Sequence, residues 1–176
     1  MSEKVNKEFW LGQLFTLLAT VVGVYLAANS GFEKAIEFEN LQHQRDVYHV
    51  QQSLLGEIQV NTERLQSWVD EFDKAPQSNS MSMQPDKYQL DTFFWNAAQE
   101  GSAIFEMPHQ YVSGISAFYQ RAEYLRSQLL SGNPFEAPKA SEKLRQLTTE
   151  TRIQLLKNIQ QHITEQKQQL QKTGLI

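Results

Sequence analysis

The sequence predicts an all-α protein: an N-terminal single transmembrane helix followed by an antiparallel helical bundle of three long helices and one short helix. Three observations predict this fold. Residues 9–28 carry no charged side chain, and an apolar helix of about 20 residues crosses a bilayer core of roughly 30 Å. Beyond that run, apolar residues recur three or four positions apart, as in amphipathic helices. No segment shows the alternation between turn signals that predicts a strand.

Residues 1–8 are expected to form a short N-terminal tail, residues 9–28 the transmembrane helix, and residues 29–176 a helical soluble domain. A cleaved signal peptide is an alternative, because lysines precede the apolar run and small residues follow it. The apolar region of a signal peptide has roughly 7 to 15 residues, however, and the large Tyr25 and Leu26 fall near the cleavage positions. A buried core helix is a second alternative, but no other segment is apolar enough to surround it. A retained anchor is the preferred interpretation.

The first helix of the soluble domain is expected over residues 32–74. Residues 29–31 precede it as a small polar segment at which a helix can end, bend or continue. No proline interrupts the predicted helix, and its apolar face consists of Val47, Val50, Leu54, Ile58, Leu65, Trp68 and Phe72. Residues 75–86 contain Pro76 and Pro85 among several serines and are expected to form an exposed loop.

The short helix is expected over residues 91–100, with Asp91 or Thr92 as its N-cap and Gly101 at its end. Three consecutive aromatic side chains, at residues 93–95, cannot all face one way on a helix. Two of them are expected to enter the core, and the third to pack at an edge or meet a partner.

Two further long helices are expected over residues 108–131 and 139–173. Pro108 suits the first position of the earlier one, because proline lacks only an N–H that has no partner there. The apolar face of that helix is Tyr111, Ile115, Phe118, Ala122, Leu125 and Leu129. The last helix is rich in glutamine and has a narrower apolar stripe: Leu144, Leu147, Leu155, Ile159, Ile163 and Leu170.

Composition excludes several classes of function. The net charge is -4, with 16 basic residues scattered among 20 acidic ones, so the chain lacks the basic stripe that binds phosphate, and no nucleic acid is expected as a partner. Cysteine is absent, which removes disulfides, thiol catalysis and thiolate metal sites.

No catalytic or metal site is expected. Glu39 with His43, and Asp46 with His49, lie one helical turn apart, but a di-iron bundle needs Glu-x-x-His pairs on two helices. Only residues 106 and 109 have that spacing, and a proline lies between them. The sequence contains no glycine-rich phosphate loop, nucleotide fingerprint or nucleophile elbow. The protein is therefore expected not to be an enzyme and to need no cofactor.

One face of the predicted transmembrane helix consists of small and weakly polar residues. Small side chains let two helices approach closely in lipid, and a glutamine amide seeks a hydrogen-bond partner there. The face is expected to pack against another transmembrane helix, of the same chain or of a partner protein. Its residues are Gly12, Gln13, Thr16, Ala19, Thr20, Gly23 and Ala27.

Positive charge is denser before the span than after it. Residues 1–8 hold Lys4 and Lys7, whereas residues 29–48 mix Lys34 and Arg45 with four acidic residues. Since positive flanks favour the cytoplasmic side, the N-terminus is expected in the cytoplasm and the helical domain in the periplasm or outside the cell.

The order of features resembles a group of uncharacterised bacterial single-span membrane proteins with a helical soluble domain. In that group the membrane helix is followed by the pattern L-x-x-E-I/L-x-x-N-x-x-x-L, which matches Leu54, Glu57, Ile58, Asn61 and Leu65; the later Trp95, Gly101 and Tyr119 also match. The resemblance implies a bacterial inner membrane and this architecture, and it implies no activity. Because Asn61 occupies an otherwise apolar position, we expect it to hydrogen-bond within the bundle and to set the register of its helices.

These observations predict a non-enzymatic protein, anchored in the lipid bilayer, that acts as a small subunit or scaffold of a bacterial envelope complex through helix–helix interactions. An extracytoplasmic sensory or ligand-binding module is the alternative. It would need a partner span to signal, since residues 1–8 are too few for an output domain. An oligomeric pore is a weaker alternative, because one span with three uncharged polar groups lines a pore poorly.

Overall fold

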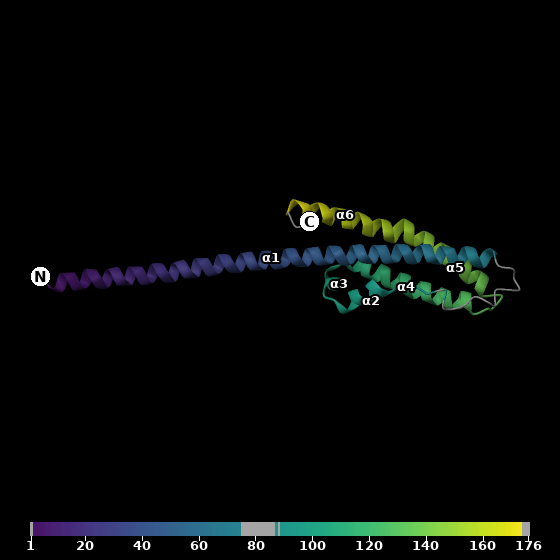
Figure 1. Ribbon diagram of the computed structural model, residues 1–176, viewed down its shortest axis with the longest axis horizontal. Helices are drawn as coiled ribbons and strands as arrows, with labels where there is room; N and C mark the ends of the chain where they lie inside the picture. Colours follow the sequence, from purple (N-terminus) through teal and green to yellow (C-terminus); the bar gives the residue numbers. More distant parts are fainter. Residues whose placement is uncertain (1, 75–86, 88, 174–176) are drawn as a thin grey trace. The chain divides into compact units, whose positions relative to one another are not determined.

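The computed structural model describes residues 2–74, 87 and 89–173, with the side chains of residues 2–6 excluded. All regular structure in these ranges is helical, which confirms the all-α prediction. The elements in chain order are α1 (Ser2–Lys74), α2 (Phe93–Glu100), α3 (Ala103–Glu106), α4 (His109–Leu130), α5 (Ala137–Glu150), the π-helical segment η3 (Thr151–Leu156) and α6 (Lys157–Lys172), as Figure 1 shows. The loop expected over residues 75–86 lies outside the described residues.

Helix α1 is continuous from Ser2 to Lys74, so residues 2–8 are helical. Of the possibilities left open for residues 29–31, the helix continues through them. No proline interrupts the backbone there, and the Asn29 side chain donates a hydrogen bond to Glu33 Oε1 at 3.2 Å, within the helix. A lone glycine costs a helix only about 1 kcal/mol. The polar segment is therefore tolerated inside the helix.

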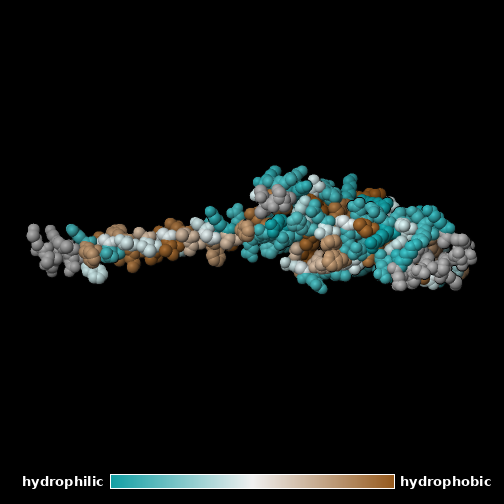
Figure 2. All heavy atoms as spheres, viewed as in Figure 1, coloured by the Kyte–Doolittle hydropathy of each residue, from teal (hydrophilic) through white to brown (hydrophobic). Residues whose placement is uncertain are grey.

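The chain divides into two compact units, Met1–His43 and Gln44–Ile176, which we call the N-terminal and C-terminal units. In the N-terminal unit, α1 contains an 18-residue window with a mean hydropathy of 1.8, none of it buried. Figure 2 shows hydrophobic side chains along this part of the helix. By length and composition, α1 is the one helix among the described residues that can cross a membrane.

The C-terminal unit has one hydrophobic core, to which α1, α2, α4, α5 and α6 contribute. The faces that periodicity predicted supply most of it. Leu54, Ile58 and Leu65 of α1 are at most 1 % exposed, and the whole predicted face of α4 is buried. Each fully buried side chain of this size contributes about 1.5–3 kcal/mol. The core therefore accounts for the association of these helices.

The aromatic residues of α2 depart from the prediction that two of them enter the core. Trp95 is 8 % exposed, whereas Phe93 and Phe94 are 69 % and 44 % exposed. An eight-residue helix that rests on the core with one face buries about one side chain per turn, and Trp95 and Ala98 occupy that face. The prediction for this segment was wrong.

The last helical stretch of the chain contains a π-helical segment. It begins at Ala137, with Pro138 in the first turn, where the missing N–H has no intrahelical partner. It then passes through the π-helical segment η3 before α6 completes it.

Helix α4 begins at His109, with Pro108 as the N-cap residue. Gly132 follows the end of α4 with a φ of 68°, the left-handed conformation that glycine adopts at helix ends.

Candidate functional site

The predicted packing face of the span lies on the exposed part of α1. All of its residues are exposed, and no side chain of the described residues lies within 4 Å of a Cβ atom placed on Gly12 or Gly23. The hydroxyls of Thr16 and Thr20 donate to the carbonyls of Gly12 and Thr16 at 2.9 and 2.8 Å, which satisfies them within the helix. Among the described residues, the Gln13 amide has no hydrogen-bond partner. The face thus combines small side chains with one amide that makes no hydrogen bond within the helix.

A buried polar network lies in the C-terminal unit, centred on the carboxylate of Glu57. Glu57 is 5 % exposed. Its Oε2 accepts the N–H of Phe94 at 2.5 Å, and its Oε1 accepts the N–H of Trp95 at 3.0 Å and the phenol of Tyr119 at 2.5 Å. The carboxylate of α1 therefore holds the first turn of α2 and the middle of α4 at once.

Asn61, one helical turn after Glu57, extends the network. Its Nδ2 donates to the backbone carbonyl of Asp91 at 2.5 Å, and its Oδ1 accepts the N–H of Asp91 at 2.8 Å. The same Nδ2 lies 3.2 Å from the hydroxyl of Tyr119, which accepts from it. Asn61 is fully buried. These bonds are of the kind that can set the register of the helices, and that role of Asn61 stays a prediction.

Glu57 accepts hydrogen bonds from the N-terminus of α2, a capping role that the sequence analysis gave to Asp91 or Thr92. Thr92 is the N-cap residue of α2 but makes no side-chain cap bond, and Asp91 Oδ1 accepts the N–H of Phe93 at a long 3.3 Å. The N–H groups at a helix start have no intrahelical partner, and the helix dipole favours an anion there. Because an isolated eight-residue helix is unstable in water, Glu57 is a main reason that α2 forms.

Tyr119 keeps its proton in this environment. Burial, the hydrogen bond to Glu57 and the negative charge of Glu57 raise its pKa well above the ordinary value of 10.0. Its ring stacks on Trp95, with centroids 5.8 Å apart and an interplanar angle of 22°. Tyr119 therefore donates a hydrogen bond to Glu57 and also packs against α2.

The network explains several residues that the sequence pattern singled out. Leu54, Ile58 and Leu65 are core residues, whereas Glu57, Asn61, Trp95 and Tyr119 meet in the network. Sequence reasoning named Asn61 as a polar core residue but missed Glu57. The available signal was the spacing, since a glutamate four residues before a buried asparagine lies on the same helix face.

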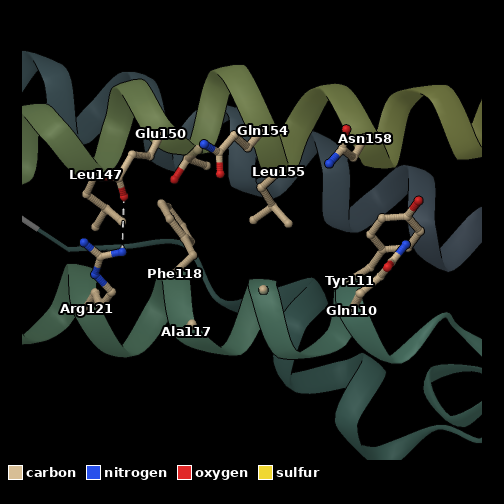
Figure 3. Close-up of a pocket in the computed structure, with 12 residues that line it drawn as sticks. Gln110, Tyr111, Ala117, Phe118, Arg121, Leu147, Glu150, Gln154, Leu155 and Asn158 are labelled. Atoms are coloured by element: carbon tan, nitrogen blue, oxygen red, sulfur yellow. Dashed lines mark hydrogen bonds and ion pairs between the residues drawn. The ribbon is translucent and has the colours of Figure 1, made fainter.

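A groove lies on another side of the C-terminal unit, between α4 and the segment from α5 to α6 (Figure 3). It has a volume of about 350 Å³. Arg121 and Glu150 form an ion pair at one end, with Nη1 and Oε2 3.3 Å apart, and Tyr111 lies at the other end. The sequence did not predict this groove, because it depends on how two helices distant in the chain diverge.

No group of three or more His, Asp or Glu side chains is arranged to hold a metal ion in the described ranges. Comparisons with known proteins add no assignment: no family model, no curated protein and no solved structure matches this chain. The residues themselves therefore carry the functional argument.

Replacing Glu57 with glutamine should lower the free energy of unfolding of the C-terminal unit by about 2 kcal/mol. The glutamine amide keeps one acceptor oxygen, so at least one buried donor of α2 or Tyr119 loses its partner. Urea titration of the full chain in detergent, followed by circular dichroism, measures the change. Glu63→Gln, on an exposed position of α1, is the matched control, and an equal effect of both substitutions would show that the network adds nothing.

Stability should also fall above about pH 10, because the pKa of Tyr119 is higher in the folded than in the unfolded protein. The tyrosine's contribution is complete below the unfolded pKa and is lost as the unfolded chain releases its proton at higher pH. Urea titrations between about pH 8 and pH 11 should show a smaller loss in Tyr119→Phe than in the wild type. The exposed Tyr124 provides the control, and the prediction fails if Tyr124→Phe reduces the loss equally.

Proposed function

We propose that this chain is a non-enzymatic membrane-anchored protein that acts by binding, as a small subunit or scaffold of a bacterial envelope complex. The apolar part of α1 spans the inner membrane, with the N-terminus in the cytoplasm and the C-terminal unit outside it. The helices of that unit form an antiparallel bundle. The partner is another transmembrane helix, from a second copy or from a different protein.

The observation that carries this proposal is the exposed face of α1 from Gly12 to Ala27. Helices in lipid associate through close packing of small residues and through interhelical hydrogen bonds. The small side chains at Gly12 and Gly23 allow close approach of a second helix, and the amide of Gln13 can form a hydrogen bond that lipid cannot supply.

The buried network supports a binding role rather than catalysis. Glu57 and Tyr119 are a buried acid and a buried phenol in direct contact, and each is engaged in holding helices together. A general acid or base needs access to a substrate within hydrogen-bond reach. Neither side chain lines the groove, so the network is a structural element in this proposal.

A sensory or ligand-binding module is the second candidate function, and the groove between α4 and η3 favours it. Its volume of about 350 Å³ falls at the lower end of the range for small-molecule sites. In that case, the span face would transmit the signal to a partner helix. Both candidates therefore need the span face to bind.

Gly12→Leu and Gly23→Leu should each weaken association of the span several-fold, because a leucine side chain separates the two helix backbones. The chain lacks cysteine, so a single Gln168→Cys substitution, at an exposed position of α6, allows labelling with donor and acceptor dyes. Energy transfer in proteoliposomes measures self-association, and crosslinking in native membranes measures association with another protein.

Ala28→Leu is the matched control, since it also replaces a small residue by leucine but lies on a different side of the helix. It should leave both signals at the wild-type level. If neither energy transfer nor crosslinking responds to the two glycine substitutions, the face does not mediate binding and the proposal is wrong.

A further inference from the structure

The groove between α4 and η3 exists because the side chains of α4 that line its centre are small. Helix α4 presents Gly114 and Ala117 to it, whereas its neighbouring positions carry larger side chains. A Cβ atom at position 114 would lie 2.8 Å from Leu155 Cδ1, so glycine lets Leu155 lie directly against the α4 backbone. Leu155 closes the floor at this point, and the space beside it stays open.

The opposite wall contains the π-helical segment. Thr151, Gln154 and Leu155 of η3 line the groove. A π-helical turn holds one more residue than an α-helical turn, lowers helix stability and occurs frequently at functional sites. Its position in this wall is a second observation, independent of the small residues of α4, that distinguishes the groove from an ordinary gap between helices.

The two ends of the groove differ in chemistry. Arg121 and Glu150 lie side by side at one end, and both side chains are about half exposed, so both charges are open to a ligand. Arg121 makes this ion pair through Nη1 alone. Among the described residues, the other four of the five N–H donors of Arg121 are therefore available to a ligand. This end therefore offers a cation and an anion a few ångströms apart.

The middle of the groove is apolar, and its far end carries amides. Phe118 and Leu147 are buried beneath the middle of the groove, at 2 % and 3 % exposure. The partly buried Leu155 and the exposed Ala117 are the apolar side chains that a ligand can reach there (Figure 3). The side-chain amides of Gln110 and Asn158 line the far end. A ligand that fits has an anionic and a cationic group close together and a short apolar substituent next to them.

We propose that this groove binds a small zwitterion with an apolar substituent, of the class of free α-amino acids with aliphatic or aromatic side chains. Arg121 binds the carboxylate, Glu150 binds the ammonium group, and the apolar side chain lies on Leu155 and Ala117. This inference rests on the second candidate function, ligand binding in this groove, and names the class of ligand. It does not depend on the proposed binding of a transmembrane helix, because the groove lies wholly in the C-terminal unit.

The test is calorimetric titration of the full chain in detergent with L-phenylalanine and L-leucine. Saturable binding with one site per chain is expected for at least one of them. 3-Phenylpropionate, which lacks the ammonium group, and phenethylamine, which lacks the carboxylate, should each bind at least tenfold more weakly than L-phenylalanine. Equal binding of all three aromatic probes, or no saturable binding of either amino acid up to its solubility, would overturn the proposal.

Two pairs of variants place the site. Ala117→Trp fills the groove and should abolish binding, whereas Ala97→Trp, at an exposed position of α2, should not change it. Arg121→Gln should weaken binding at least tenfold, and Arg152→Gln, an exposed position of η3 outside the groove lining, should not. If Ala117→Trp fails to fold by circular dichroism, the arginine pair decides, and equal binding by both arginine variants contradicts the proposal.

Discussion

The hydrogen bonding of the Glu57 carboxylate is the interaction on which the placement of α2 against α1 and α4 depends. The carboxylate takes three hydrogen bonds, from the N–H groups of Phe94 and Trp95 and from the phenol of Tyr119. A buried charge is costly unless its acceptor sites are filled, and here donors from two other helices fill them. One side chain of α1 thereby fixes the positions of α2 and α4.

The burial of α2 follows from this constraint. With its first turn bound to Glu57 and Asp91 bound to Asn61, α2 presents Trp95 to the ring of Tyr119. Helical geometry then directs Phe93 and Phe94 away from the core, and both side chains are exposed. Hydrophobic burial alone would favour more than one aromatic side chain inside, so the polar network determines which one is buried.

The sequence predicted what depends on local periodicity and missed what depends on tertiary contacts. The apolar stripe of α4 and the core residues Leu54, Ile58 and Leu65 follow from a three-and-four spacing. The capping of α2 does not, because its acceptor, Glu57, is more than 30 residues away along the chain. The groove could not be predicted either, because the close contact of Gly114 with Leu155 leaves no pattern in the sequence around either residue.

The two proposed binding surfaces differ in what maintains them. The span face is a property of one helix in lipid, whereas the groove requires that α4 stay fixed in the C-terminal unit, and Tyr119 on α4 is bound to Glu57. The network therefore links the stability of the unit to the shape of the groove.

Amide hydrogen exchange at Phe94 and Trp95, measured by NMR on the full chain in detergent micelles, tests the central claim most directly. First-turn amides of a helix have no intrahelical partner and normally exchange fast. The account predicts that these two amides exchange as slowly as core amides of α4, because Glu57 accepts their hydrogens. Exchange at the rate of unprotected amides would contradict it.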